Sequence, residues 1–180
     1  NVAGVDLTAG LSDMTFVRAQ GLNGPIWALI ALDCGAYDIP QCADGEEQTT
    51  REGLVAEILS AQCADGGWTL MGDVSDVDMT AMALQALAPY YKDGGNETVN
   101  TAVEKALNWL SGKYRSGYDS SESCAQVVIA LSALNLDANT DARFTKTVEG
   151  KTLSVLGNLL QYRVAENGGF KHQFADKAVN

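Results

Sequence analysis

Helical segments of two kinds alternate along this chain, and this alternation constrains its fold more than any other feature. A helix that is apolar all round is typically buried all round, whereas an amphipathic helix covers a core with one face. The pattern therefore predicts three inner helices covered by three outer helices. The apolar segments are residues 25–35 (PIWALIALDCG), 78–91 (DMTAMALQALAPYY) and 121–134 (SESCAQVVIALSAL), and the amphipathic ones are residues 49–62, 98–114 and 151–164.

A turn of glycine followed by an aromatic residue recurs between these helices. Its copies read DGGW at 65–68, SGY at 116–118 and NGGF at 167–170. Gly67, Gly117 and Gly169 are 50 and 52 residues apart, a spacing typical of stacked helical repeats. We expect the three aromatic rings to pack between adjacent repeats, with stacking on a sugar or another ligand as the alternative.

The repeats predict an all-α fold of stacked helical hairpins. No segment sustains the period-two alternation of a strand. Fully apolar inner helices favour a ring over an open solenoid, so we expect an α/α toroid, of which this chain supplies a partial ring of about three hairpins. We also expect the chain to be a fragment of a longer protein. The repeats span about residues 20–64, 65–115 and 116–166, and a further one starts at 167–180.

Charge and cysteine usage narrow the classes of partner. The net charge of −11 repels nucleic acid and anionic membrane surfaces, and no apolar run is long enough to span a bilayer. None of the four cysteines forms a CxxC pair, so zinc-site spacing is absent. Cys34 and Cys42 are close enough for a local disulfide in an exported chain, while Cys63 and Cys124 are expected to be buried free thiols.

The stretch QCADGGW, residues 62–68, resembles the repeat of the squalene cyclase and protein prenyltransferase β-subunit superfamily. Together with DVDMTAMALQALAPYY and ESCAQVVIALSALNLD, it is similar more specifically to the prenyltransferase-like repeat domains of Gram-positive surface and secreted proteins. Those domains resemble the α-domain of the cobalamin carriers intrinsic factor and transcobalamin. The resemblance covers about residues 20–175. It implies an α/α toroid and an extracellular or cell-surface location, and it leaves the function open.

The acids before the second apolar helix allow two interpretations. Class II terpene cyclases, which the resemblance brings in, protonate an alkene with the middle acid of a DxDD motif followed by Thr-Ala. Asp78 occupies the position of that acid and Asp76 that of the first, but Met79 replaces the third. The alternative is that Ser75, Asp76 or Asp78 caps the helix by accepting N–H groups of its first turn. We predict a cap, with ligand contact and acid catalysis left open.

The sequence gives little support to prenyl transfer, thioester chemistry or hydrolysis by a nucleophilic serine. A prenyltransferase needs a zinc site of Asp, Cys and His, and the single histidine, His172, lies far in sequence from every cysteine. We expect it on the surface. Neither a thioester motif nor a Gly-x-Ser-x-Gly nucleophile turn is present. We therefore expect no catalytic residue and no metal site.

The inner helices align with one another, and their equivalent positions give the ligand-binding candidates. Core packing is the alternative fate for these side chains. The first set begins each helix and the second lies one turn later: Asn23, Asp78 and Glu122, then Trp27, Met82 and Gln126.

These observations predict a non-catalytic extracellular domain that binds a ligand or takes part in surface interactions. We expect a small-molecule or glycan ligand and further domains in the same polypeptide, without nucleic acid binding or membrane insertion. Cobalamin is expected only with an additional β-rich domain, since the carriers hold it between two domains. The alternatives are an isoprenoid cyclase or prenyltransferase-like enzyme that uses Asp78 as its acid, and a purely architectural repeat module.

Overall fold

The computed structural model describes residues 3–4, 6–92, 96–166 and 168–176. The described residues are mostly helical, as predicted, with seven α-helices and one small β-hairpin. The elements are α1 (Met14–Arg18), α2 (Asn23–Cys34), α3 (Arg51–Ser60), α4 (Val77–Leu87), α5 (Glu97–Ser116), α6 (Ser121–Ala133), β1 (Thr145–Val148), β2 (Lys151–Ser154) and α7 (Val155–Gln161), with 3-10 helices at Ala9–Leu11, Ala88–Tyr90 and Ala142–Phe144.

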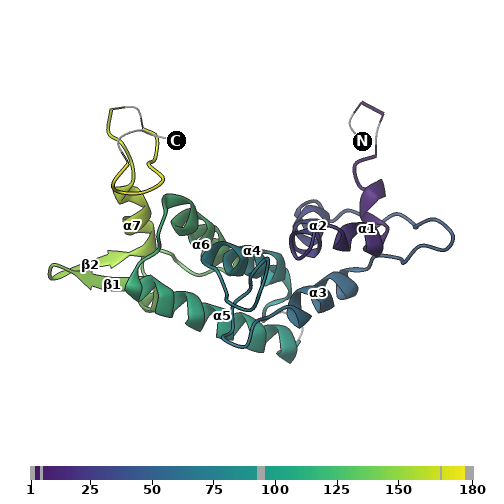
Figure 1. Ribbon diagram of the computed structural model, residues 1–180, viewed down its shortest axis with the longest axis horizontal. Helices are drawn as coiled ribbons and strands as arrows, with labels where there is room; N and C mark the ends of the chain where they lie inside the picture. The colour runs from purple at the N-terminus through teal and green to yellow at the C-terminus, as the bar shows by residue number, and fades with distance from the viewer. Residues whose placement is uncertain (1–2, 5, 93–95, 167, 177–180) are drawn as a thin grey trace.

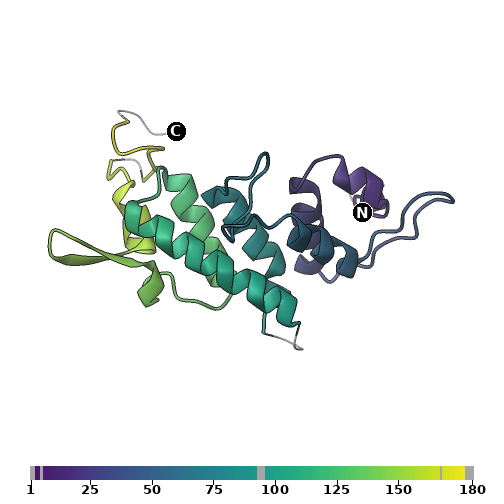
Figure 2. The ribbon, with the colours of Figure 1, turned by 60° about the horizontal axis from the view of Figure 1, so that its bottom comes forward.

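The helices lie in two layers. α4 packs against both α2 and α6, so these three apolar helices form one row. Each member of the row has a second helix against it, because α3 contacts α2, α5 contacts α4 and α7 contacts α6. Figure 1 shows the row above α3 and α5, and Figure 2 shows α3 and α5 in front of it after the turn. These contacts agree with the predicted alternation of inner and outer helices.

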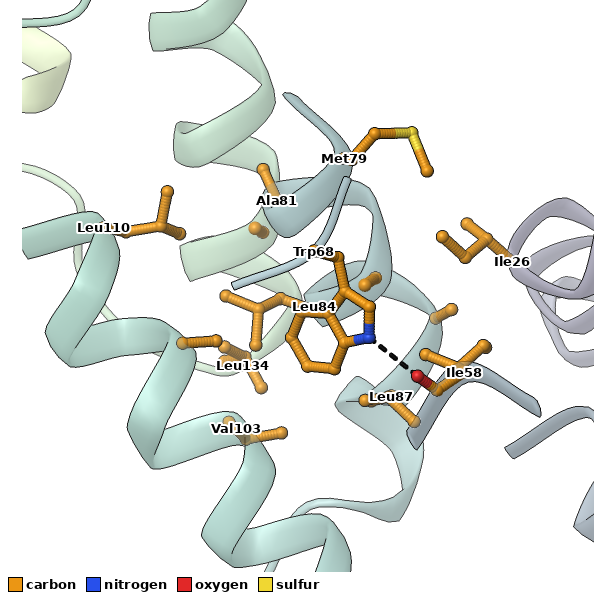
Figure 3. Close-up of a cluster of buried hydrophobic side chains, with 14 of the residues drawn as sticks. Ile26, Ile58, Trp68, Met79, Ala81, Leu84, Leu87, Val103, Leu110 and Leu134 are labelled. Carbon is orange, nitrogen blue, oxygen red and sulfur yellow. Dashed lines mark hydrogen bonds between the residues drawn. The ribbon is translucent and has the colours of Figure 1, made fainter. Parts of the chain in front are cut away.

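The first glycine and aromatic turn is built into the core between α3 and α4. The Trp68 side chain is fully buried. Its indole Nε1 donates a hydrogen bond to the Ile58 carbonyl at 2.7 Å, and Figure 3 shows the ring beside Leu84 and Leu87. Its backbone N–H donates to Thr80 Oγ1 at 2.9 Å. This ring therefore packs between repeats, as predicted.

The other two copies of the turn differ in detail. Tyr118 is buried, with its hydroxyl donating to the Leu110 carbonyl at 2.9 Å, whereas Phe170 is only partly buried. In the first copy Gly66, two residues before the ring, has a φ of +98°; in the second the left-handed residue is Gly117, directly before the ring, with a φ of +105°. The second copy reads SGY, with a single glycine, and α5 continues to Ser116, directly before that glycine. The repeat is therefore approximate in backbone conformation.

The β-hairpin corrects the all-α prediction. β1 and β2 pair antiparallel, and the two residues between them, Glu149 and Gly150, have φ values of +50° and +77°. Positive φ at both central positions suits a tight hairpin turn. Strands of four residues are too short to give a sustained alternation, which is why no strand was predicted. The last amphipathic helix consequently begins at Val155 and not at 151, after Ser154 Oγ accepts the Gly157 N–H at 3.0 Å.

One side of the inner row is open, which corrects the prediction that these helices are buried all round. Trp27 on α2 is 48% exposed and Ile129 on α6 is 51% exposed. Among the described residues, α3 and α5 cover the other side of the row, and α7 packs beside α6 at its end. Partly or fully exposed positions recur in the same register on the three helices, and we call them the open stripe: Asn23, Trp27 and Ile30; Asp78, Met82 and Gln85; Glu122, Gln126 and Ile129.

The four cysteines are free thiols in the structure. Cys34 Sγ lies 3.2 Å from the Ala31 carbonyl and Cys42 Sγ lies 3.6 Å from the Glu46 carbonyl, so the local disulfide considered from their spacing is not formed. Cys124 is buried, as predicted, and Cys63 is half-buried.

The longest described helix is α5, with 20 residues. Its buried stripe packs against the core while charged residues such as Lys105 and Arg115 face water. Across the ranges that the structure describes, no helix combines the length and the apolar character needed to cross a membrane.

Candidate functional site

Asp76 is the N-cap of α4. Its backbone is extended, with φ −115° and ψ 158°, and its Oδ1 accepts the Met79 N–H at 2.7 Å. The Asp76 N–H donates to the Trp68 carbonyl at 2.9 Å, which fixes the cap to the buried turn. Of the three candidates for the cap, the structure selects Asp76. Its carboxylate is therefore engaged as an acceptor of the helix N-terminus.

Asp78 lies inside the first turn of α4 and does not cap it. Its Oδ1 is buried and has no hydrogen-bond partner among the described residues. A buried acceptor without a donor lowers the stability of the folded state. Burial of the Cys124 thiol, together with a smaller contribution from the charge of Asp78, raises the pKa of that thiol.

A hydrogen-bond network joins this helix start to α5. Asp65 accepts from Ser75 Oγ through Oδ1 and from Trp109 Nε1 through Oδ2, the latter at 2.9 Å. Although desolvation opposes ionisation of Asp65, the hydrogen bonds from Ser75, the Gly67 N–H and Trp109 lower the pKa of this carboxyl below its ordinary value. The network holds the loop before α4 against the middle of α5.

A pocket of about 300 Å³ opens beside the first turn of α4, and we call it the acid pocket. Asp76, Asp78 and Asp119 line it together with Trp109, Lys113 and Ser123. The Lys113 ammonium lies 5.2 Å from the centroid of the Trp109 ring, so the protein's own cation already faces this aromatic wall. The structure thus brings the two acids of the proposed motif into one pocket, beside residues that the sequence analysis did not single out.

A second pocket of about 300 Å³ lies between α1 and α2, and we call it the aromatic pocket. Asn23 and Trp27, both predicted as ligand-binding residues, line it together with Phe16 and Gln20. None of its lining residues carries a charge; the others are Leu11, Val17, Gly24 and Ala28.

The aromatic pocket owes its shape to a close backbone crossing. A Cβ added at Gly24 of α2 would lie 1.8 Å from the Val17 carbonyl oxygen of α1, so only glycine permits this approach. Asp13 starts α1 by accepting the Thr15 N–H at 2.9 Å. The crossing brings the Phe16 ring, which is 59% exposed, to the same pocket as Trp27.

The remaining predicted residues lie elsewhere on the open stripe. Gln85 Nε2 donates to Gln126 Oε1 at 2.9 Å, which joins the stripes of α4 and α6. Met82 is half-buried beside them. The six ligand-binding candidates therefore share a register, but the structure does not gather them into one site.

Glu122 is paired with the single histidine. His172 Nδ1 lies 2.8 Å from Glu122 Oε2, and the Ser121 N–H donates to the His172 carbonyl at 3.0 Å. The backbone N–H of Glu122 itself and then the His172 ring lower the pKa of the Glu122 carboxyl. His172 lies on the surface, as predicted, and ties the segment after α7 to the start of α6.

Phe16 and Gln20 were not predicted because they lie before Asn23, the first position of the aligned inner helices. A signal for α1 was present, since Asp13 directly before MTFV is a typical helix start. Nothing in the sequence indicated that this short helix crosses α2 beside Trp27. Throughout the described part of the chain, no three His, Cys, Asp or Glu side chains lie together in a group that could hold a metal ion.

Comparison with known proteins finds one partial similarity. The chain is 33% identical over 93 residues to the uncharacterized protein y4kT of Sinorhizobium fredii (strain NBRC 101917 / NGR234). The matched part is 49% of this chain and 17% of that protein, so the chain spans only a small share of it. No family model matches the chain, and no solved structure matches it.

Proposed function

We propose that this chain is a non-catalytic ligand-binding or surface-interaction domain of an exported, cell-surface or secreted protein. The observation that carries the proposal is the aromatic pocket, in which two predicted ligand residues, Asn23 and Trp27, meet a second exposed ring. Ligand pockets are typically concave and largely apolar, with a few polar groups that orient the ligand. The resemblance to surface and carrier domains supports the same class of function.

We propose in addition that the two layers are part of an α/α toroid. The row of α2, α4 and α6 with an outer helix against each member supports this architecture. Figure 1 adds that residues 6–13, before α1, and residues 168–176, after α7, rise on the side of the row away from α5. In a closed ring of such hairpins, the open stripe faces the centre.

An isoprenoid enzyme is the second candidate. The buried Asp78 Oδ1 favours it, because an acid that protonates an alkene is not engaged in capping a helix. Against it stand the capping role of Asp76 and the methionine in place of the third acid. The ligand-binding function therefore takes precedence.

Turnover separates these two candidates. Wild type and Asp78→Asn are incubated with squalene, farnesyl diphosphate and geranylgeranyl diphosphate, and products are followed by mass spectrometry. We expect no product from either protein. Product formed by wild type and lost in Asp78→Asn would establish the enzyme.

Binding is tested with Nile red, a neutral dye whose fluorescence rises in apolar sites. We expect Trp27→Ala to reduce the bound signal by about half or more, because Trp27 supplies much of the exposed apolar surface of its pocket. Leu160→Ala is the control, since Leu160 on α7 is 55% exposed and lies outside that pocket. Equal signals from the two variants would count against a binding function for the aromatic pocket.

A further inference from the structure

We propose that the aromatic pocket binds a neutral sugar residue of a glycan, with the sugar ring packed on Trp27 and its hydroxyl groups hydrogen-bonded to Gln20 and Asn23. This inference rests on the proposed ligand-binding function and assigns its ligand class.

The two rings of the pocket are available to a ligand. Phe16 is 59% exposed and Trp27 is 48% exposed, whereas the repeat rings Trp68 and Tyr118 are buried in the core. Exposed aromatic side chains that share one pocket are typical of binding surfaces, whereas single exposed apolar residues are ordinary. The flat apolar face of a sugar ring, formed by its C–H groups, is complementary to such a ring.

Two carboxamides stand beside the rings with their hydrogen-bonding capacity unused. No hydrogen bond joins the side chain of Gln20 or Asn23 to another residue within the described ranges, while both line the pocket. Each carboxamide offers two donors and an acceptor, and each sugar hydroxyl also both donates and accepts. A polyhydroxylated ligand therefore satisfies both amides, whereas a hydrocarbon chain leaves them unpaired.

The charges of the pocket and of the whole chain disfavour cationic and anionic ligands. No carboxylate lines the pocket to pair with a cationic ligand, and the net charge of −11 repels an anionic one. The nearest basic residue along α1, Arg18, is committed to Glu47 and to Glu57, the latter with its Nη2 at 2.7 Å from Glu57 Oε1. The pocket is thus selective for an uncharged ligand.

The size of the pocket limits how much of a glycan it contacts. Its volume of about 300 Å³ is at the small end of the range of about 300 to 1,000 Å³ that ligand pockets occupy. One or two sugar rings fill it, so the structure assigns recognition of a short glycan segment or chain end.

The test is titration of the protein with cellotriose, maltotriose and N-acetylchitotriose, followed by calorimetry and by the change in tryptophan fluorescence. We expect at least one trisaccharide to bind, with Trp27→Ala weakening its affinity by about tenfold or more. Asn23→Ala and Gln20→Ala are each expected to weaken it by about three- to tenfold. Trp27→Phe keeps a ring and is expected to retain most of the affinity.

Tyr37→Ala is the matched control, because Tyr37 is 52% exposed and lies outside the pocket. An unfolding transition measured for each variant separates lost binding from lost structure. Absence of binding for all three trisaccharides, or equal weakening by Trp27→Ala and Tyr37→Ala, overturns the sugar assignment. Nile red binding that depends on Trp27 in the absence of sugar binding overturns it too and leaves the proposed ligand-binding function standing.

Discussion

Asp76 and Asp78 are two residues apart on α4, yet the structure gives their carboxylates opposite hydrogen-bonding states. Asp76 accepts a helix N–H, and Asp78 Oδ1 is buried without a donor. Spacing alone could place an acid near the helix start, but it could not choose between the two. The choice depends on the backbone pairing of Asp76 with Trp68, which keeps residue 76 extended, so that the helix begins at Val77.

The cap makes a direct prediction for stability. Asp76→Ala is expected to lower the free energy of unfolding by about 0.5 to 2 kcal/mol, because the Met79 N–H loses its acceptor. Asp76→Asn preserves the cap and is expected to stay near wild type. Asp78→Ala removes an unpartnered buried oxygen, so we expect no loss of stability from it. Urea unfolding at neutral pH measures all three, and a larger loss in Asp78→Ala than in Asp76→Ala would contradict the assignment.

The Asp65 network predicts a dependence of stability on acid. Because the pKa of Asp65 is lowered in the folded state, ionised Asp65 stabilises the fold above its unfolded pKa, and this contribution is lost as the pH falls through the folded value. We expect Asp65→Asn to flatten the fall of unfolding free energy below about pH 4. Asp44→Asn, at an exposed loop position, is expected to keep the wild-type profile. Chemical unfolding at a series of pH values measures this dependence. If the free energy of unfolding falls in parallel for wild type and Asp65→Asn, ionised Asp65 does not stabilise the fold.

At the scale of elements, α1 and α2 cross at Gly24 with no room for a side chain. This crossing forms the aromatic pocket, since it brings residues from both helices together in its lining. The contact is between main-chain atoms, and it therefore depends on one residue type at one position.

Gly24→Ala is expected to destabilise the protein by about 1 to 3 kcal/mol, because the new methyl group would meet the Val17 carbonyl at 1.8 Å and force the helices apart. Gly112→Ala is the matched control: nothing lies within 4 Å of a Cβ built there on α5. We expect it to be neutral or stabilising by up to about 1 kcal/mol, from the better helix propensity of alanine. Thermal unfolding compares the two, and similar effects would show that the crossing is not tight.

The sequence could predict the elements whose signal is long and local. The segment 121–134 contains α6, the segment 78–91 covers α4 except its first residue, and the segment 98–114 lies within α5. The hairpin and α1 escaped because each has four or five residues per element, too few for periodicity to accumulate. The shared pocket of Trp27 and Phe16 could not be predicted for a different reason. It depends on how α1 and α2 cross, and the pattern of residues along a sequence carries no information on the geometry of a helix crossing.

At the scale of the whole molecule, α4 is the centre of the fold. It contacts α2, α5 and α6, and seven of its eleven residues are buried. The short α1 and α7 lie toward the two ends of the row, with two buried residues each. Stability is therefore expected to fall from the middle of the row toward its ends.

Hydrogen exchange followed by mass spectrometry tests this gradient. Amides of α4 are expected to exchange most slowly, because they open only when most of the core opens, and those of α1 and α7 fastest among the α-helices. If the amides of α4 exchange as fast as those of α1, the middle of the row is no more stable than its ends, and the predicted gradient is wrong.

The crossing at Gly24 also separates two properties of the aromatic pocket that usually change together. The main-chain frame of the pocket is fixed where α1 and α2 cross, since no side chain fits at Gly24. Its chemical preference is set by Phe16, Gln20, Asn23 and Trp27, which extend from that frame. Under the proposed function, exchanges among these four side chains would change the shape and the chemistry of the pocket while the helix crossing that frames it stays in place.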